Sequence, residues 1–427
     1  MKDRHKLPEK IALLISSFVL FIFTSEVILG LMGFNYYPVD IKVNIPEKDR
    51  VFRLNMTSGY YEIAKEKLST YMGDLTYTFA YQKFKEVKDL GTYRIFILGG
   101  SSVWNLANDP YYNEYANEKF KFFYPNKELE IVFAGGGSHG TSTLYPILQE
   151  ILEYKPDLIV LYSGHNEFLN FAEGKFYLEH RGIIDEINEK LEKFRIYQFL
   201  SKIIIPIKNS LNTGNRDMEI IDPSEWVGAL NETHKQIVYE NYRLNIEDMI
   251  RMAKNKNVNF VLSTVSYNHM SPPVSPHLVE DALKKLNTKK PEDVFGESAI
   301  NFSREQIEEI LNIITNQGNM EELNEYKLGL KYYEKGQFEK AREHFEKGLL
   351  LEDFPHRANS ISNGVIRELA KEYNVPLADV EIAVLNATEH SITTYEYFDD
   401  HCHLNRRGNE ILLDTFLKTI KEKKLVE

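Results

Sequence analysis

Hydrophobic runs and helical periodicity alternate along most of the chain after residue 90. Short apolar runs that end in glycine or polar residues are typical of buried parallel strands. We predict four such strands, at 93–100, 128–137, 157–164 and 258–266. Helical patterns lie between them, for example at 143–154 and 235–254. Strands that alternate with helices predict an α/β fold in which helices cover both faces of a parallel sheet.

The N-terminus has a different pattern, because residues 11–34 form one apolar run long enough to span a bilayer as a helix. Its only charge, Glu26, lies about 24 Å beyond Lys10 along a helix, near the far interface. Basic residues before the run predict a cytoplasmic N-terminus and an extracytoplasmic remainder, in the periplasm or at the cell surface. A cleaved signal peptide and a buried core helix are the alternatives. An uncleaved single-pass anchor is favoured, since the run is long and lacks a clear A-x-A site.

We expect five segments along the chain. They are a membrane anchor at 1–35, a connector packed on the main domain at 36–90, the first part of the α/β domain at 91–270, a helical insertion at 271–355, and the last part of the α/β domain at 356–427. Between the strands, residues 186–212 predict one or two amphipathic helices broken at Pro206. A helix that covers the sheet is the favoured interpretation, and contact with a membrane surface is the alternative.

The helical insertion contains a segment at about 322–355 with the spacing of a tetratricopeptide repeat. Small residues there would let two antiparallel helices approach closely, and aromatic side chains would fill the gap between them. The residues concerned are Gly329, Ala341 and Gly348, with Tyr332 and Phe345. A plain helical hairpin is the alternative. A repeat or a hairpin would be a packing module rather than a catalytic one. We expect this module to offer a surface for a protein partner.

Composition narrows the class of protein. The chain has 427 residues and is 43% hydrophobic, which suits a globular protein with a large core. The net charge of −12 argues against a nucleic-acid partner, since phosphate binding needs a basic face. The single cysteine, Cys402, rules out an intramolecular disulfide and does not reveal the compartment.

Polar residues follow three of the predicted strands, in the segments GGSS, GGGSHG and SGHNE. The carboxyl ends of parallel strands are where ligands bind in such sheets. Ser101 in the first segment is a candidate nucleophile. In DDHCH near the C-terminus, Asp400 and His403 have a spacing at which the carboxylate can hold the imidazole Nδ1–H. Nε2 would then accept the serine proton, and Asp399 and His401 are the nearby alternatives.

Two further segments supply donors for an oxyanion, which covalent ester hydrolysis requires. Asn166 has a side-chain amide, and Gly137 has a backbone N–H that no side chain obstructs. Each signal is weak alone, because a turn, a surface charge or a metal site would explain it equally well. Their order and their positions at strand ends favour a single site.

Together these segments resemble the four sequence blocks of the SGNH (GDSL-type) hydrolase superfamily. The matching stretches are LGGSS, AGGGSHG, YSGHNEF and DHCHLNRRGNEIL, within roughly 91–270 and 356–420. The anchor and the tetratricopeptide-like insertion resemble a membrane-anchored bacterial branch of that superfamily. Two positions depart from the pattern, Gly100 where Asp or Glu is frequent and Gly135 where Asn is frequent.

The resemblance implies a three-layer α/β/α sandwich of the flavodoxin-like type. It also implies that Ser101 is the nucleophile, His403 the base and Asp400 its orienting partner. The oxyanion hole would consist of the Ser101 and Gly137 N–H groups and the Asn166 amide. No cofactor and no metal is implied.

We therefore expect a membrane-anchored extracytoplasmic serine esterase that acts on ester bonds. O-acetyl groups of an envelope glycan or lipid are candidate substrates, on the basis of location alone. Two alternatives stay open. An O-acyltransferase would use the same triad with an alcohol in place of water. A non-catalytic scaffold would bind a partner through the helical insertion.

Overall fold

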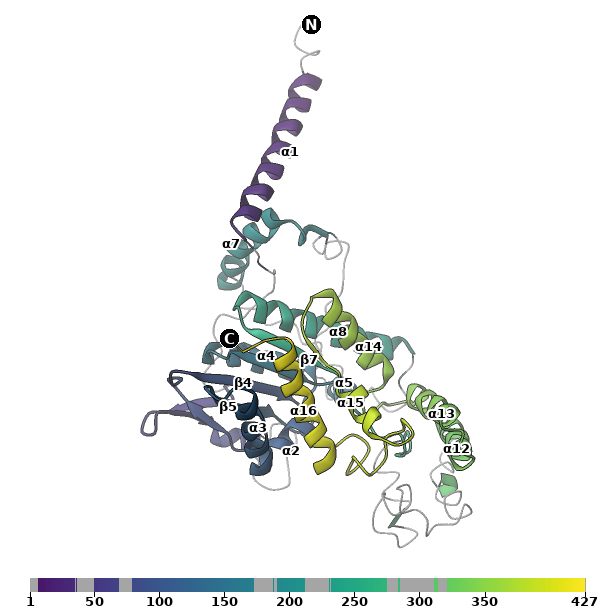
Figure 1. Ribbon diagram of the computed structural model, residues 1–427. Helices are drawn as coiled ribbons and strands as arrows, with labels where there is room; N and C mark the ends of the chain where they lie inside the picture. The colour runs from purple at the N-terminus through teal and green to yellow at the C-terminus, as the bar shows by residue number, and fades with distance from the viewer. Residues whose placement is uncertain are drawn as a thin grey trace.

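The computed structural model describes residues 7–34, 36, 50–68, 79–172, 187, 190–211, 230, 232–274, 283–284, 311–313 and 321–426. The described chain forms a mixed α/β domain with a central parallel sheet, and an apolar N-terminal helix projects from it (Figure 1). The predicted fold class is confirmed at this level.

The central sheet contains five parallel strands in the order β5-β4-β6-β7-β8. They are β4 (Thr92–Gly99), β5 (Glu128–Gly135), β6 (Leu158–Tyr162), β7 (Asn259–Ser263) and β8 (Leu377–Ala378). The first four coincide with the predicted strands to within a few residues. Counted along the sequence the order is 2-1-3-4-5, so the direction of winding reverses between β4 and β6. In open α/β sheets, ligands bind at this switch point, outside the carboxyl ends of the strands.

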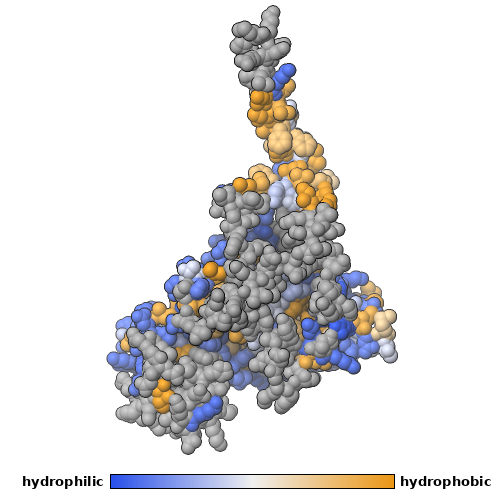
Figure 2. Space-filling view, turned by 180° about the vertical axis from the view of Figure 1, so that it is seen from behind, coloured by the Kyte–Doolittle hydropathy of each residue, from blue (hydrophilic) through white to orange (hydrophobic). Residues whose placement is uncertain are grey.

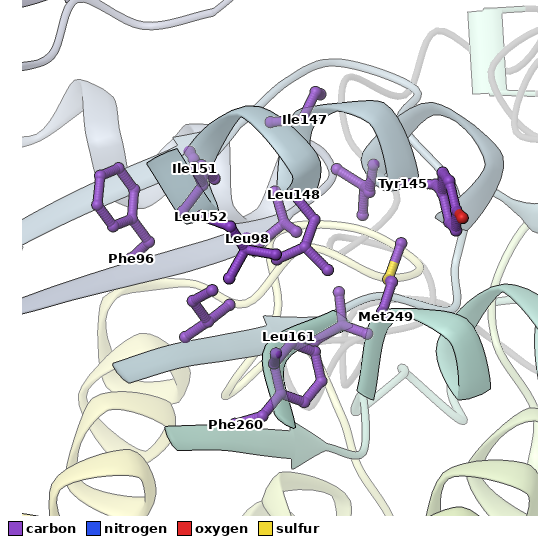
Figure 3. Packing of buried hydrophobic residues seen from close by; sticks show 14 of the residues in the cluster. Phe96, Leu98, Tyr145, Ile147, Leu148, Ile151, Leu152, Leu161, Met249 and Phe260 are labelled. Atoms are coloured by element: carbon purple, nitrogen blue, oxygen red, sulfur yellow. The ribbon is translucent and has the colours of Figure 1, made fainter. Parts of the chain in front are cut away.

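Alternate residues of each strand face opposite sides of the sheet, and each side has its own hydrophobic core. One core is covered by α4 (Thr141–Ile151), α8 (Glu232–Asn255) and α14 (Ser360–Glu372). The other is covered by α2 (Ser101–Asn108), α3 (Pro110–Phe123), α15 (Val380–Ala387) and α16 (Arg406–Glu422). In the first core, Phe96 and Leu98 of β4 and Leu161 of β6 lie below Leu148 and Ile151 of α4 (Figure 3).

A small antiparallel sheet precedes the central one. Its strands are β1 (Phe52–Asn55), β2 (Tyr60–Ile63) and β3 (Lys83–Lys85), and the short 3-10 helix η3 (Lys65–Lys67) follows β2. Phe52 and Phe84 are buried in the first core, where their ring centroids lie 5.2 Å apart. The buried carboxylate of Glu150 in α4 accepts hydrogen bonds from the Val51 and Phe52 N–H groups, both at 2.7 Å. The described part of the 36–90 segment therefore packs on the α/β domain.

Two helices of the predicted insertion are described, α12 (Glu321–Glu334) and α13 (Phe338–Leu351), and they pack against each other. A Cβ at Gly329 would lie 2.6 Å from the Phe345 ring, so the glycine is required for this close approach. The hairpin is also joined to the α/β domain, since the Tyr267 hydroxyl donates to Glu346 of α13 at 2.9 Å. Most of residues 271–320, including the part that precedes the hairpin, lies outside the described residues.

Helix α1 (Leu7–Leu31) contains an apolar span at Lys10–Leu31 that is long enough to cross a membrane, and Leu29 is its one buried residue. A membrane anchor and a signal sequence share these properties. Helix α7 (Arg195–Leu211) packs beside the end of α1 (Figure 1). The predicted break at Pro206 is wrong, because the helix continues to Leu211. The favoured position on the sheet is also wrong, since no side chain that the structure describes in α7 belongs to either core of the central sheet.

Candidate active site

Ser101 is the first residue of α2 and follows the end of β4 directly. The turn between them is tight, because a Cβ at Gly99 would lie 2.3 Å from the carbonyl oxygen of Tyr162 in β6. Only glycine allows β4 and β6 to approach so closely at this point. The Ser101 side chain therefore lies at the carboxyl end of β4, beside the switch point of the sheet.

His403 connects Ser101 to Asp400. Its Nε2 lies 2.7 Å from Ser101 Oγ, and its Nδ1 lies 2.6 Å from Asp400 Oδ2. Both distances are those of hydrogen bonds. With the Nδ1 proton held by the carboxylate, Nε2 is the acceptor for the serine hydroxyl proton.

The loop before α16 holds Asp400 in a single orientation. Asp400 Oδ1 accepts hydrogen bonds from the N–H groups of Cys402 and His403, both at 2.8 Å, while Oδ2 faces the imidazole. Of the two nearby alternatives, His401 Nδ1 lies 3.6 Å from Asp400, and Asp399 donates its N–H to the His403 carbonyl. The structure thus places Asp400 and His403, rather than Asp399 and His401, in line with Ser101.

The ionisable side chains of this loop shift one another's pKa values. Burial would raise the pKa of Asp400, but the hydrogen bond and charge of His403 hold it well below its usual range. The pKa of His403 is well above its usual value, because the Cys402 sulfur and the Asp400 carboxylate favour the imidazolium. Burial would raise the pKa of the Cys402 thiol, but His401 and His403 lower it to about 6. Asp400 is therefore ionised at neutral pH, as the partner of a catalytic imidazole must be.

Besides Ser101, the two other predicted oxyanion donors lie at the same end of the sheet. Asn166 follows β6, and its Nδ2 donates one hydrogen bond to the His139 carbonyl at 3.2 Å. The amide carries a second N–H, which this bond does not use. Gly137 follows β5 in a turn, and the preceding Gly136 N–H donates to the Gly99 carbonyl at 3.3 Å. Both donors therefore flank the turn that carries Ser101.

Two side chains that the sequence reasoning missed hold the glycine-rich loop after β5. Both lie in α5 (Glu167–Ala172), one turn apart. The buried Glu167 carboxylate accepts from the Thr141 N–H at 3.1 Å and from its hydroxyl at 2.6 Å. Asn170 accepts from the Gly140 N–H and donates to the Ser138 carbonyl, both at 2.6 Å. Their i,i+3 spacing directly after Asn166 was the available signal.

Two more missed residues hold the loop that carries Asp400. Asn268 donates its N–H to the His401 carbonyl and its side-chain amide to the Asp400 carbonyl, both at 3.0 Å. The buried Arg357 guanidinium donates to the Asn268 carbonyl at 3.0 Å and also reaches the His401 carbonyl at 3.5 Å. No local pattern indicates these contacts, because they join segments far apart in the chain.

His165, the residue before Asn166, is buried and neutral. Burial and the nearby charge of His403 lower its pKa to about 3. Its Nδ1 accepts a hydrogen bond from the Ala358 N–H at 3.1 Å, so the ring proton resides on Nε2. This bond ties the Asn166 loop to the segment that follows the helical hairpin.

Both departures from the superfamily pattern have a steric reason. A Cβ at Gly100 would lie 2.6 Å from Asn166 Nδ2 and 2.8 Å from the His139 carbonyl oxygen. A Cβ at Gly135 would lie 2.5 Å from the Trp104 N atom in the first turn of α2. Any larger side chain at either position would therefore displace Asn166 or α2.

Replacing Gly100 with alanine should lower kcat by about 10²-fold, comparable to the loss of one oxyanion donor. The new methyl group would push the Asn166 amide from its position. Steady-state kinetics on a soluble ester would measure the change.

Gly364→Ala is the matched control, since its Cβ would meet no atom within 4 Å in α14. It should keep wild-type kcat and gain about 0.5–1 kcal/mol of stability. Wild-type kcat in Gly100→Ala would contradict a role for Asn166.

One group of potential metal ligands lies in the described part of the chain. Ligand atoms of Asp400, His401 and Cys402 all lie within 4.8 Å of one another. Both Asp400 oxygens already accept hydrogen bonds, from His403 and from two backbone N–H groups. A metal ion bound here would compete with the Asp400–His403 contact.

No family model matches the chain, and no curated protein sequence matches it. Several solved structures align with it at low identity. An acetyl xylan esterase aligns at 13% identity over 77% of this chain and 99% of that chain, with a TM-score of 0.36. A GDSL-like lipase from Bacteroides thetaiotaomicron aligns at 12% over 78% and 88%, with a TM-score of 0.32. An acetyl-xylooligosaccharide esterase from Geobacillus aligns at 11% over 77% and 94%, with a TM-score of 0.35. Alignments at this level do not assign an activity.

Proposed function

We propose that this chain is a membrane-anchored serine esterase of the SGNH (GDSL-type) superfamily. The single observation that carries the proposal is the unbroken chain of contacts from Ser101 Oγ through His403 to Asp400, at 2.7 and 2.6 Å. The four sequence blocks and the position of Ser101 at the switch point of a parallel sheet support the same proposal.

In the first half of the reaction, Ser101 Oγ attacks the carbonyl carbon of the ester while His403 Nε2 takes the hydroxyl proton. Asp400 stabilises the imidazolium that forms. The negative oxygen of the tetrahedral intermediate would accept hydrogen bonds from the Ser101 and Gly137 N–H groups and from Asn166 Nδ2. The bond to the alcohol then breaks, and the alcohol leaves with the proton from His403 Nε2. An acyl group remains on Ser101.

In the second half, water attacks the acyl carbon and His403 takes one of its protons. The intermediate collapses, Ser101 recovers its proton, and a carboxylic acid leaves. An O-acyltransferase would differ only at this stage, since an alcohol acceptor would replace water. The triad geometry is the same for both outcomes, so the acceptor has to be tested directly.

The rest of the proposal concerns location and substrate. Helix α1 would be an uncleaved anchor with its N-terminus in the cytoplasm, which places the α/β domain outside the cytoplasm. Esters available there include O-acetyl groups of an envelope glycan or lipid. The hairpin of α12 and α13 would be part of a tetratricopeptide-like insertion that receives a protein partner.

Reaction of the full chain with a fluorophosphonate tests the nucleophile, and we expect one adduct, on Ser101. Peptide mass spectrometry would locate it. Turnover of p-nitrophenyl esters of increasing chain length would then show the acyl preference. A folded protein that neither reacts nor turns over any ester would overturn the esterase proposal. Acyl transfer to an added glycan that outpaces hydrolysis would instead establish the O-acyltransferase.

A further inference from the structure

Helix α7 has its apolar face turned outward. Among the α7 side chains that the structure describes, Gln198 and Ser201 are the most buried, each about 8% exposed. Five large apolar side chains on other sides of the helix are exposed, and we call them the α7 stripe. They are Phe199, Leu200, Ile203, Ile204 and Ile207, between 39% and 56% exposed. A surface helix of a soluble protein has the opposite arrangement, because burial of its apolar face stabilises it.

Helix α7 is attached to the end of α1. The Glu26 carboxylate of α1 accepts hydrogen bonds from the Arg195 and Ile196 N–H groups at 3.0 and 3.1 Å. These are N–H groups of the first turn of α7, which have no partner within the helix. Glu26 also forms an ion pair with the Arg195 side chain at 3.5 Å. Beyond α1, the Phe34 ring contacts Phe199 at a centroid distance of 5.7 Å. These contacts fix the position of α7 relative to α1.

The attachment point sets the depth of α7. A helix rises about 1.5 Å per residue, so Glu26 lies about 24 Å beyond Lys10 in a bilayer core of about 30 Å. Helix α7 thus begins near the outer interface of any membrane that α1 spans. Lys202 lies there over the Phe34 and Tyr36 rings, at 5.4 and 5.8 Å. Aromatic rings and cations are characteristic of this layer of a membrane.

We propose that α7 is an interfacial helix that lies in the outer surface of the bilayer spanned by α1, with the α7 stripe in contact with lipid. The proposal rests on the anchor function proposed for α1. Apolar surface extends along α1 and widens at its C-terminal end, where α7 packs (Figure 2). One continuous apolar surface suits one continuous partner, the lipid phase. The exposed cations Lys193, Arg195 and Lys202 would meet lipid phosphates.

This arrangement would restrict how the α/β domain sits on the membrane. A single spanning helix leaves the attached domain free to rotate and tilt. A second helix that lies in the interface and is bonded to the first removes much of that freedom. The site at the switch point would therefore stay at a set height above the bilayer.

Depth-dependent quenching in the full chain tests the proposal. Cys402 is replaced by alanine, and one cysteine at a time is introduced for an environment-sensitive fluorophore. The positions are Ile204 in the α7 stripe, Val19 in α1, and Ile382 in α15 as the matched control, with exposures of 56%, 59% and 44%. Each protein is reconstituted in phosphatidylcholine–phosphatidylglycerol vesicles that contain a spin-labelled lipid, with the spin label either near the headgroup or at the bilayer centre.

We expect the spin label near the headgroup to lower the Ile204 signal about twofold or more, since interfacial helices insert about 5–10 Å. The central spin label should quench Val19 most strongly, and neither should affect Ile382. An Ile204 signal that resembles Ile382 while Val19 is quenched would overturn the interfacial helix and leave the anchor intact. An unquenched Val19 would overturn the anchor itself. If Ile204 is shielded from aqueous iodide but not quenched by lipid, protein covers the stripe and the proposal is wrong.

Discussion

Replacing Ser101 with alanine is expected to lower kcat for ester hydrolysis by about 10⁵–10⁶-fold, as the loss of a catalytic nucleophile does in serine hydrolases. The substitution removes the one oxygen that lies 2.7 Å from His403 Nε2. No acyl-enzyme can then form, so labelling by a fluorophosphonate should disappear as well. The fold should persist, since alanine is tolerated in the first turn of a helix.

The neighbouring serine provides the matched control. Ser102 is also in the first turn of α2, but it is buried. Ser102→Ala should keep the fluorophosphonate adduct and lower kcat far less than Ser101→Ala does. Circular dichroism and thermal unfolding of both variants would show that each is folded. Equal loss of activity in the two variants would mean that α2 matters for structure and that Ser101 is not the nucleophile.

Replacing Asp400 with asparagine is expected to lower kcat by about 10⁴-fold while the fold stays intact. The carboxylate holds the proton on His403 Nδ1, and an amide no longer enforces that tautomer. The pH profile should change too. His403 must be neutral to accept the serine proton, so activity rises with pH as the imidazolium loses its proton. Cys402 and Asp400 both raise the pKa of His403, so loss of the Asp400 charge moves this rise to lower pH.

The profile of kcat/KM against pH distinguishes this role from a structural one. Asp399→Asn is the matched control, because Asp399 is exposed and adjacent in the chain, and its backbone N–H, which the substitution keeps, donates to the His403 carbonyl. It should leave both kcat and the pH profile close to wild type. A large fall in kcat for Asp400→Asn without a shift of the profile would indicate that Asp400 only supports the loop through Cys402 and His403.

The features that depend on residues close together in the chain could be predicted from the sequence. Short apolar runs that end in glycine or polar residues predicted β4, β5, β6 and β7, because a strand buried on both faces has a recognisable composition. The i,i+3 spacing of Asp400 and His403 predicted their hydrogen bond, since both lie in one short loop. The apolar N-terminal run likewise predicted α1. In each case the determining residues are close together in the chain.

Local sequence patterns do not predict the other features. The small sheet of β1, β2 and β3 was not predicted, because its strands are short and lack a clear alternation. The inward-facing Gln198 and Ser201 of α7 depend on the contact with α1. The same is true of Asn268 and Arg357, which reach the Asp400 loop from distant segments.

The sequence by itself determined β4, β5, β6, β7 and α1 and the side chains available for chemistry, because strand burial, glycine turns and loop spacing are encoded within a few residues. Only the tertiary structure decided that Ser101 and His403, 302 residues apart, meet at 2.7 Å. That meeting depends on the strand order 2-1-3-4-5, which brings the ends of β4 and β6 together with the loop before α16. The order arises from packing of the two cores against the sheet, and such long-range packing leaves no periodic signal in the chain.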